Sequence, residues 1–279
     1  MLKDITLGQY YPVDSFVHRL DPRIKIILTL AFIVGVFLGE SLLAYIPVIA
    51  FIYLTAKVAH LPVKLLVKGL RPLRFILIFT FVLNLFFSAG DTVLIKLGFI
   101  VISQEGLLTA IKFSARLIFL VTGASMLTLT TSPVVLTDGL ERLLSPLRKI
   151  GFPAHELAMM MTIALRFIPT LLEEADKIMK AQMARGADFE SGNIIDRAKA
   201  MIPLLVPLFV SAFRRAGDLA MAMEARCYHG SEGRTRMRVL KITKNDWLAA
   251  AGVAALILLI IAESHVTLPL WNMVKGLFA

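Results

Sequence analysis

Two arginines, each at the end of a predicted helix, have the type and spacing that suit a binding surface. Both follow an alanine and precede a small residue: Ala184, Arg185 and Gly186 in the first copy, and Ala225, Arg226 and Cys227 in the second, 41 positions later. A guanidinium offers planar, multidentate hydrogen bonding and is weakly hydrated, which suits an interface between proteins. The alanine leaves room for another surface to approach. The alternative is that each arginine is only a counter-charge for the unpaired carbonyl groups at its helix end.

Charged residues at matching positions in the two helices form a second pattern. Alignment of Arg185 with Arg226 places Glu173 and Glu174 on Arg214 and Arg215. If the two helices cross near that level, the opposite charges predict salt bridges between them. The alternative is that all four are solvated surface charges, which contribute little to stability.

Motifs for catalysis or for a resident cofactor are absent from the sequence. It contains no G-x-x-x-x-G-K-[ST] loop for nucleotide phosphates, and His155-Glu156 lacks the second histidine that a zinc-protease motif requires. The five histidines are scattered without metal-ligand spacing. We therefore expect no metal, no cofactor and no enzymatic activity in this chain, and a structural role for each histidine.

Some polar and flexible side chains in the apolar helices are candidates for contact with a partner. Arg116 lies within a predicted membrane span, where charged residues usually face protein or a polar cavity. Snorkelling to the interface is the alternative for both Arg116 and Lys112, and it is favoured for Lys112, which lies near the end of that span. Met159, Met160 and Met161 begin a long helix, and flexible thioethers suit a surface that accepts several partners, although ordinary packing also explains them.

The elements that carry the two arginines are long helices with apolar first halves and charged second halves. Apolar residues at three- and four-residue spacing predict one helix over about 154–185, with a kink at Pro169 and an end at Gly186. A second helix is expected over about 195–228, with kinks at Pro203 and Pro207. Before them, 133–149 is typical of a short amphipathic helix interrupted at Pro146.

The remainder of the chain is apolar enough for a membrane. Of 279 residues, 57% are hydrophobic, which is too high a share for an ordinary soluble domain. Stretches of suitable length and hydropathy predict five spans, near 24–39, 42–59, 73–89, 107–130 and 247–263. The segment 90–106 alternates and predicts a small hairpin or an interfacial loop. The predicted fold class is an all-α integral membrane protein with about five transmembrane helices and two long helices outside the membrane.

Basic residues predict the orientation of these spans. The connection between the second and third spans holds Lys64, Lys68, Arg71 and Arg74, and Arg19, Arg23 and Lys25 precede the first span, whereas Glu40 alone carries charge between the first two spans. By the positive-inside rule the N-terminus is cytoplasmic and the C-terminus is outside. The expected organisation is a membrane region 1–130, a cytoplasmic region 131–246, and a last span with a short external tail, 247–279.

Three segments of the chain resemble a known family. Residues 7–26, 161–188 and 214–230, the last two containing the paired Ala-Arg patterns, are similar to the transmembrane T component of energy-coupling factor (ECF) transporters, the EcfT/CbiQ family. The similarity runs in order over nearly the whole chain. It departs from the family pattern at Cys227, where a glycine is usual.

The resemblance implies a function and partners. In that family the T component joins two ABC-type ATPases (A components) to a substrate-binding membrane protein, the S component, for ATP-driven uptake of a micronutrient, and arginines that match Arg185 and Arg226 dock on the ATPases. It also makes the S component the expected partner of Met159, Met160, Met161 and Arg116. The opening segment resembles the shared, multi-substrate branch, for which a vitamin is the expected solute, more than the branch dedicated to cobalt or nickel. From a different class, a membrane scaffold that recruits another cytoplasmic complex, or a permease that acts alone, remains an alternative.

Overall fold

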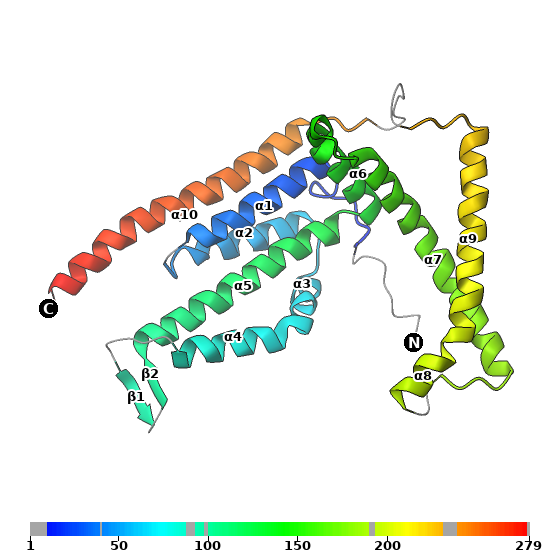
Figure 1. The fold of residues 1–279 in the computed structure, drawn as a ribbon. Helices are drawn as coiled ribbons and strands as arrows, with labels where there is room; N and C mark the ends of the chain where they lie inside the picture. Colours follow the sequence, from blue (N-terminus) through cyan, green and yellow to red (C-terminus); the bar gives the residue numbers. More distant parts are fainter. Residues whose placement is uncertain are drawn as a thin grey trace. The chain divides into compact units, whose positions relative to one another are not determined.

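The computed structural model describes residues 10–39, 41–87, 93–97, 100–189, 193–230 and 239–277, and Glu40 lies outside them. The side chains of 93–97, 100–102, 194 and 264–277 are not described. The fold is all-α apart from one two-stranded hairpin (Figure 1). The elements are α1 Pro22–Leu38, α2 Tyr45–Val58, α3 Val63–Leu70, η2 Arg71–Leu73, α4 Arg74–Phe87, β1 Val93–Leu97, β2 Ile100–Ser103, α5 Gln104–Thr130, α6 Pro133–Leu144, η3 Ser145–Ile150, α7 Ala154–Ala184, α8 Ile194–Ala200, α9 Ile202–Ala225 and α10 Lys244–Leu277.

The chain divides into two compact units. Within the described residues, one unit comprises 140–239 and the other comprises 10–139 together with 240–277. The division falls inside α6. We refer to residues 140–239 as the paired-helix unit, and to residues 10–139 with 240–277 as the bundle unit.

In the bundle unit, α1, α5 and α10 run side by side, and α2 packs against α5 and α10 (Figure 1). The core of this unit is built from all four helices, with Phe32 and Val36 of α1 against Val48 of α2, Phe119 of α5 and Ile260 of α10. Gly123 of α5 is needed for this packing, because a Cβ there would lie 2.5 Å from the Phe32 ring.

Local sequence explains where the main helices of the bundle unit begin. Asp21 precedes α1 in an extended conformation and accepts a hydrogen bond from the backbone N–H of Arg23 at 2.9 Å, and Pro22 takes the first helical position. Ser103 caps α5 in the same way, through the N–H of Gly106 at 3.0 Å. Each helix therefore starts at a residue whose side chain replaces a missing backbone partner.

Five helices of the described chain are long and apolar enough to cross a membrane: Val63–Phe87, Gln104–Thr130, Ala154–Ala184, Ile195–Ala225 and Lys244–Glu263. Three of these overlap the predicted spans near 73–89, 107–130 and 247–263. The other two are the long helices that carry the Ala-Arg patterns. The predicted spans near 24–39 and 42–59 correspond to α1 and α2, which have 17 and 14 residues.

Several element boundaries differ from the prediction. Residues 41–44 form a turn, so α2 starts only at Tyr45. The helix predicted over 195–228 is broken at Met201 into α8 and α9, because Pro203 has no N–H to continue the ladder. The expected tail after 263 is helical as far as Leu277. The ambiguous stretch before α5 forms the antiparallel β1–β2 hairpin.

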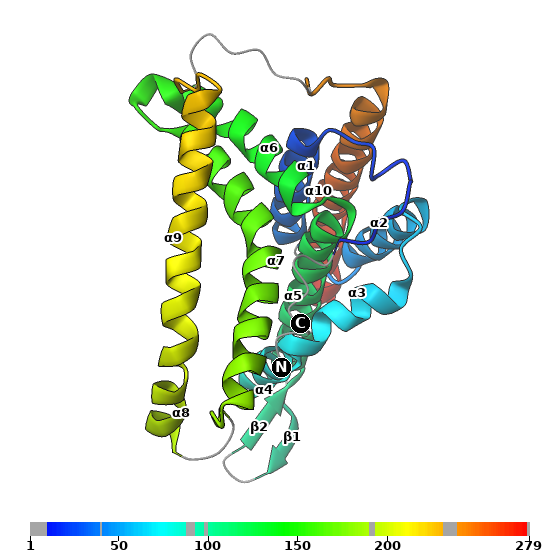
Figure 2. The same cartoon turned by 90° about the vertical axis from the view of Figure 1, so that its right-hand side faces the viewer.

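In the paired-helix unit, α7 and α9 lie side by side and run in opposite directions (Figures 1 and 2). Pro169 lies inside α7 and Pro207 inside α9. As predicted, α6 is followed at Pro146 by a tighter turn, η3, which ends at Gly151 with φ of +83°.

Candidate functional site

The two Ala-Arg patterns end their helices with the same backbone turn. After α7, the N–H of Gly186 donates to the carbonyl of Met183 and the N–H of Ala187 to that of Gln182. After α9, the N–H of Cys227 donates to Glu224 and that of Tyr228 to Met223, in the same spacing. This double hydrogen bond is the Schellman motif, which satisfies carbonyl groups at a helix end. Each arginine is therefore the last residue before a left-handed turn.

Cys227 adopts the backbone conformation that the first copy assigns to glycine. Its φ is +54°, whereas the φ of Gly186 is +89°. A side chain in this region is strained by about 1 kcal/mol, because its Cβ approaches the carbonyl oxygen. The departure from the family pattern at Cys227 thus leaves the turn itself unchanged.

Replacement of Cys227 by glycine is expected to strengthen the second turn. Glycine relieves the strain of the positive φ, and this outweighs the greater conformational freedom of glycine in the unfolded chain. The turn should therefore be more stable by about 0.5 kcal/mol, so amide hydrogen exchange over 221–228 should be about twofold slower. The matched control is Gly186→Ala, where open space surrounds the new Cβ but φ is positive, so exchange over 180–187 should accelerate. Faster exchange in Cys227→Gly would show that the cysteine side chain itself stabilises the turn.

Both arginine side chains are open to contact. Arg185, Arg226 and the alanines before them are exposed. Within the described part of the chain, neither guanidinium takes part in a hydrogen bond or an ion pair. We call residues 184–186 the Arg185 tip and residues 225–227 the Arg226 tip.

One of the two predicted charge pairs is in contact. The guanidinium of Arg215 donates to Glu174 Oε2 at 2.9 Å, which joins α7 to α9. Their side chains are 40% and 25% exposed. Glu173 and Arg214, one position away on each helix, are exposed and form no ion pair with the described residues. A step of one residue turns a helix by about 100°, so the neighbouring pair faces outward.

The two tips lie at opposite ends of the helix pair. Arg185 comes 11 residues after Glu174, and Arg226 comes 11 residues after Arg215. Because the helices are antiparallel, these equal lengths of about 16 Å extend in opposite directions from the salt bridge (Figure 2). The charge alignment predicted salt bridges only on the condition that the two helices cross near this level.

Reversal of both charges in the Glu174–Arg215 pair is expected to restore what either single reversal damages. Glu174→Arg or Arg215→Glu alone brings like charges together and should lower the free energy of unfolding by about 1 kcal/mol, as for a partly exposed pair. The double variant should recover most of this loss in thermal unfolding measured in detergent. The corresponding reversals at Glu173 and Arg214 serve as the control, with little change expected. Absence of recovery in the double variant would mean that the contact contributes nothing to stability.

The helix pair is incompletely packed beside the salt bridge. An apolar cleft of about 300 Å³ lies between α7 and α9, lined by Ile163, Phe167, Leu171, Ala212, Arg215, Ala216, Leu219, Ala220 and Met223. Arg215 is the single charged residue of this lining. The small side chains of Ala212, Ala216 and Ala220, all on α9, leave this space between the helices.

The remaining candidate contact residues fall into two groups. At the start of α7, Met160 and Met161 are 53% and 43% exposed, and Met159 is half-buried. Arg116, by contrast, is engaged within the bundle unit. It donates to the carbonyl of Gly39 at 2.9 Å and lies over the Phe37 ring at 5.2 Å, at the end of α1. It therefore serves as a counter-charge for the last carbonyls of that helix.

Lys25 was predicted only as a loop charge, but the structure buries it. Its amino group donates to the carbonyls of His18 and Thr130 and to the hydroxyl of Thr131, at 3.0–3.2 Å. These three acceptors use all the donors of an ammonium group. Lys25 thus joins the N-terminal segment to the end of α5.

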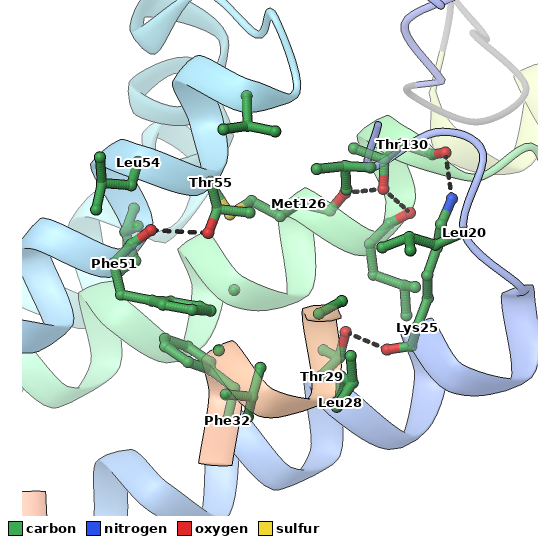
Figure 3. A pocket seen from close by; sticks show the side chains of 18 of the residues that line it. Leu20, Lys25, Leu28, Thr29, Phe32, Phe51, Leu54, Thr55, Met126 and Thr130 are labelled. Atoms are coloured by element: carbon green, nitrogen blue, oxygen red, sulfur yellow. Dashed lines mark hydrogen bonds between the residues drawn. The ribbon is translucent and has the colours of Figure 1, made fainter. Parts of the chain in front are cut away.

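Beside Lys25, the bundle unit contains an apolar cavity of about 390 Å³ (Figure 3). Its lining includes Phe32, Phe51 and Met126. The hydroxyl groups that line it are bonded to carbonyls of their own helices, such as Thr29 to Lys25 and Thr55 to Phe51, each at 2.8 Å. Most of the described residues that line it are apolar, so the cavity suits an apolar occupant best.

These observations define a class: a multi-pass helical membrane protein with a pair of long helices that end in exposed arginines. The model of a protein family described as cobalt transport protein (CbiQ) matches residues 14–237. A relative in Clostridium kluyveri named energy-coupling factor transporter transmembrane protein EcfT is 54% identical, over 94% of this chain and 97% of the relative. A relative of the same name in Acidaminococcus fermentans is 56% identical, over 93% of this chain and 97% of the relative. The relative of the same name in Bacillus subtilis is 48% identical, over 88% and 93%. The chain belongs to the EcfT/CbiQ family of transmembrane components of energy-coupling factor transporters.

Proposed function

We propose that this chain is the non-catalytic energy-coupling subunit of an ECF-type importer, which transmits movement from two cytoplasmic ATPases to a substrate-binding S component. The observation that carries the proposal is the position of the two tips. Two exposed guanidinium groups, unpaired among the residues that the structure describes, stand at opposite ends of one antiparallel, salt-bridged helix pair. Two anchors that point to opposite ends suit two separate partner subunits better than one.

The geometry suggests how movement is transmitted. Each ATPase binds one tip, and closure of the ATPases on ATP draws the tips together. Because the Glu174–Arg215 bridge lies at the same distance from both tips, the two helices turn about it by similar amounts. The apolar cleft beside the bridge gives the helices space to change their crossing angle. The S component, in contact with the helix pair, is then reoriented in the membrane.

We place the paired helices at the cytoplasmic face, although their length and composition would also allow them to span. The second half of α7 contains Glu173, Glu174, Asp176, Lys177 and Lys180. Charges at membrane depth are costly, so a segment with this many charged residues favours the aqueous side of the membrane. Residues 131–246 then form the cytoplasmic region, between a membrane region 1–130 and a last span within 247–279, with the N-terminus inside and the C-terminus outside.

The transported solute is a micronutrient, which we infer to be a vitamin, recognised by the S component. The mainly apolar lining of the cavity in the bundle unit supports this division of labour, because it suits a polar solute poorly. Met160 and Met161, exposed at the start of α7, are the candidate contacts with the S component. Arg116 is a weaker candidate because its guanidinium is already bonded to Gly39. Dedicated uptake of cobalt or nickel is the second candidate, and the description of the matched family model favours it.

Affinity purification from the native membrane tests the proposal. The tagged chain, gently solubilised, should bring down two ABC-type ATPase subunits with several small membrane proteins that bind vitamins. A single metal-specific membrane partner would favour the dedicated branch. Recovery of another cytoplasmic complex without any ATPase would identify a scaffold and refute the coupling function.

A further inference from the structure

A chain of hydrogen bonds joins the beginning of α7 to the end of α9. The Nδ1 of His155, in the first turn of α7, lies 2.9 Å from Oε1 of Glu141 in α6. Its Nε2 lies 3.4 Å from the hydroxyl of Tyr228, which follows α9. These residues are 14 and 73 positions away from His155 in the sequence, and all three belong to the paired-helix unit.

The carboxylate sets the direction of the first hydrogen bond. A carboxylate only accepts, so Nδ1 of His155 carries the proton that it donates to Glu141. The Tyr228 hydroxyl both donates and accepts, so it pairs with Nε2 of His155 whether or not that nitrogen carries a proton. Glu141 is largely buried, with its side chain 9% exposed, and that of His155 is 27% exposed. The carboxylate therefore fixes the orientation of the ring, and the ring holds the tyrosine.

Tyr228 is part of the turn that forms the Arg226 tip. Its backbone N–H closes the longer hydrogen bond of that turn, to Met223 at 3.0 Å, and it stands two residues after Arg226. At the other tip, the equivalent position is occupied by Ala187, whose N–H closes the same bond to Gln182. Alanine has no side-chain donor. The two tips are therefore alike in backbone, and Ala187 cannot make the side-chain contact that Tyr228 makes.

We propose that Glu141, His155 and Tyr228 are positioning residues that hold the Arg226 tip in one orientation against the start of α7. At the matching position of the Arg185 tip, Ala187 has no side-chain group that could make this contact. The inference rests on the proposed function for its consequence but not for its geometry. During the ATPase cycle the held tip keeps a constant angle to α7, so that movement of the ATPase bound at Arg226 passes to α7 directly.

Hydrogen exchange on the isolated chain tests the attachment without any partner. Tyr228→Phe removes only the hydroxyl, and loss of one hydrogen bond should accelerate amide exchange over 221–230 about fivefold. His155→Leu should have the same effect. His155→Gln, which keeps a donor and an acceptor, should retain most of the protection. Exchange over 180–189, at the Arg185 tip, serves as the internal control and should not change. Unaltered exchange over 221–230 in Tyr228→Phe would overturn the proposal.

The functional consequence is tested in the purified complex with its ATPases. Tyr228→Phe should leave assembly of the complex intact and lower the amount of substrate imported per ATP hydrolysed severalfold. His155→Leu should lower this ratio in the same way, and His155→Gln should keep it closer to that of the wild type. If amide exchange over 221–230 is faster but the ratio of import to ATP hydrolysis is unchanged, the three residues have only a structural role, and their proposed role in positioning the Arg226 tip is refuted. If the chain binds no ATPase, the proposed function fails, and the exchange experiment still decides whether the attachment exists.

Discussion

Replacement of both Arg185 and Arg226 by alanine is expected to abolish ATP-driven uptake while the chain remains folded and inserted in the membrane. Both side chains are exposed and unpaired within the described residues, so their removal takes nothing from the fold. At an interface, truncation of a central arginine commonly costs about 2 kcal/mol, which corresponds to roughly 30-fold weaker binding for each tip. Uptake of labelled substrate and co-purification of the ATPases measure the effect.

The single variants distinguish two anchors from one. Because the tips lie at opposite ends of the helix pair, Arg185→Ala should weaken one ATPase contact and Arg226→Ala the other, and the two losses should multiply in the double variant. The control is Arg197→Ala with Lys199→Ala, which removes the same charge from exposed positions of α8. Full uptake in the double tip variant would refute the coupling mechanism and leave the arginines as counter-charges for their helices.

Replacement of Asp246 by alanine is expected to cause the largest loss of stability. The side chain is buried, and the residue is only 1% exposed. Its Oδ1 accepts the backbone N–H of Asp21 at 2.7 Å, and its Oδ2 accepts both the N–H and the hydroxyl of Thr243, at 2.7 and 2.8 Å. It thus closes the first turn of α10 and joins that turn to the cap of α1. Alanine leaves the buried N–H of Asp21 without an acceptor and removes the partner of Thr243 at the start of α10, at a cost of about 3 kcal/mol.

Thermal unfolding in detergent should show this loss as a midpoint lower by on the order of 10 °C. Asp246→Asn, which keeps one acceptor oxygen, should fall between the wild type and the alanine variant. Asp218→Ala, at an exposed position of α9, is the control, and its effect should stay within about 0.5 kcal/mol. A midpoint for Asp246→Ala equal to that of the control would mean that solvent reaches the donors and replaces the carboxylate.

Local sequence patterns were sufficient to predict the positions of most helices and the residues at which α7 and α9 end. The end of α7 was predicted at Gly186, and the structure ends the helix there, because a left-handed residue stops the hydrogen-bond ladder within four residues. The break at Met201 was missed, although Pro203 had been recognised, because a kink and a full interruption have the same sequence signal. Nothing in the residues around Cys227 predicts its left-handed conformation, and only its alignment with Gly186 of the first tip indicates it.

Contacts between distant segments were beyond sequence reasoning. The choice of Arg215 over Arg214 as the partner of Glu174 depends on the rotation of each helix about its axis. Arg116 was expected to face a partner or a polar cavity, but it caps α1 because folding brings Gly39 within reach. Tyr228 contacts His155 across 73 positions, and Asp246 contacts Asp21 across 225. In these cases the residue types are unremarkable, and only their proximity gives them a role.

By itself, then, the sequence determined the family, the apolar character of the helices, and the residues that end α7 and α9 with an exposed arginine. These properties depend on composition and on interactions within one or two helical turns. The tertiary structure decided that the helices are antiparallel, that the tips lie at opposite ends, and that one tip is attached through Tyr228. Those properties depend on which helix faces meet, and the meeting of two faces is decided by packing over the whole unit and not by the pattern within either helix.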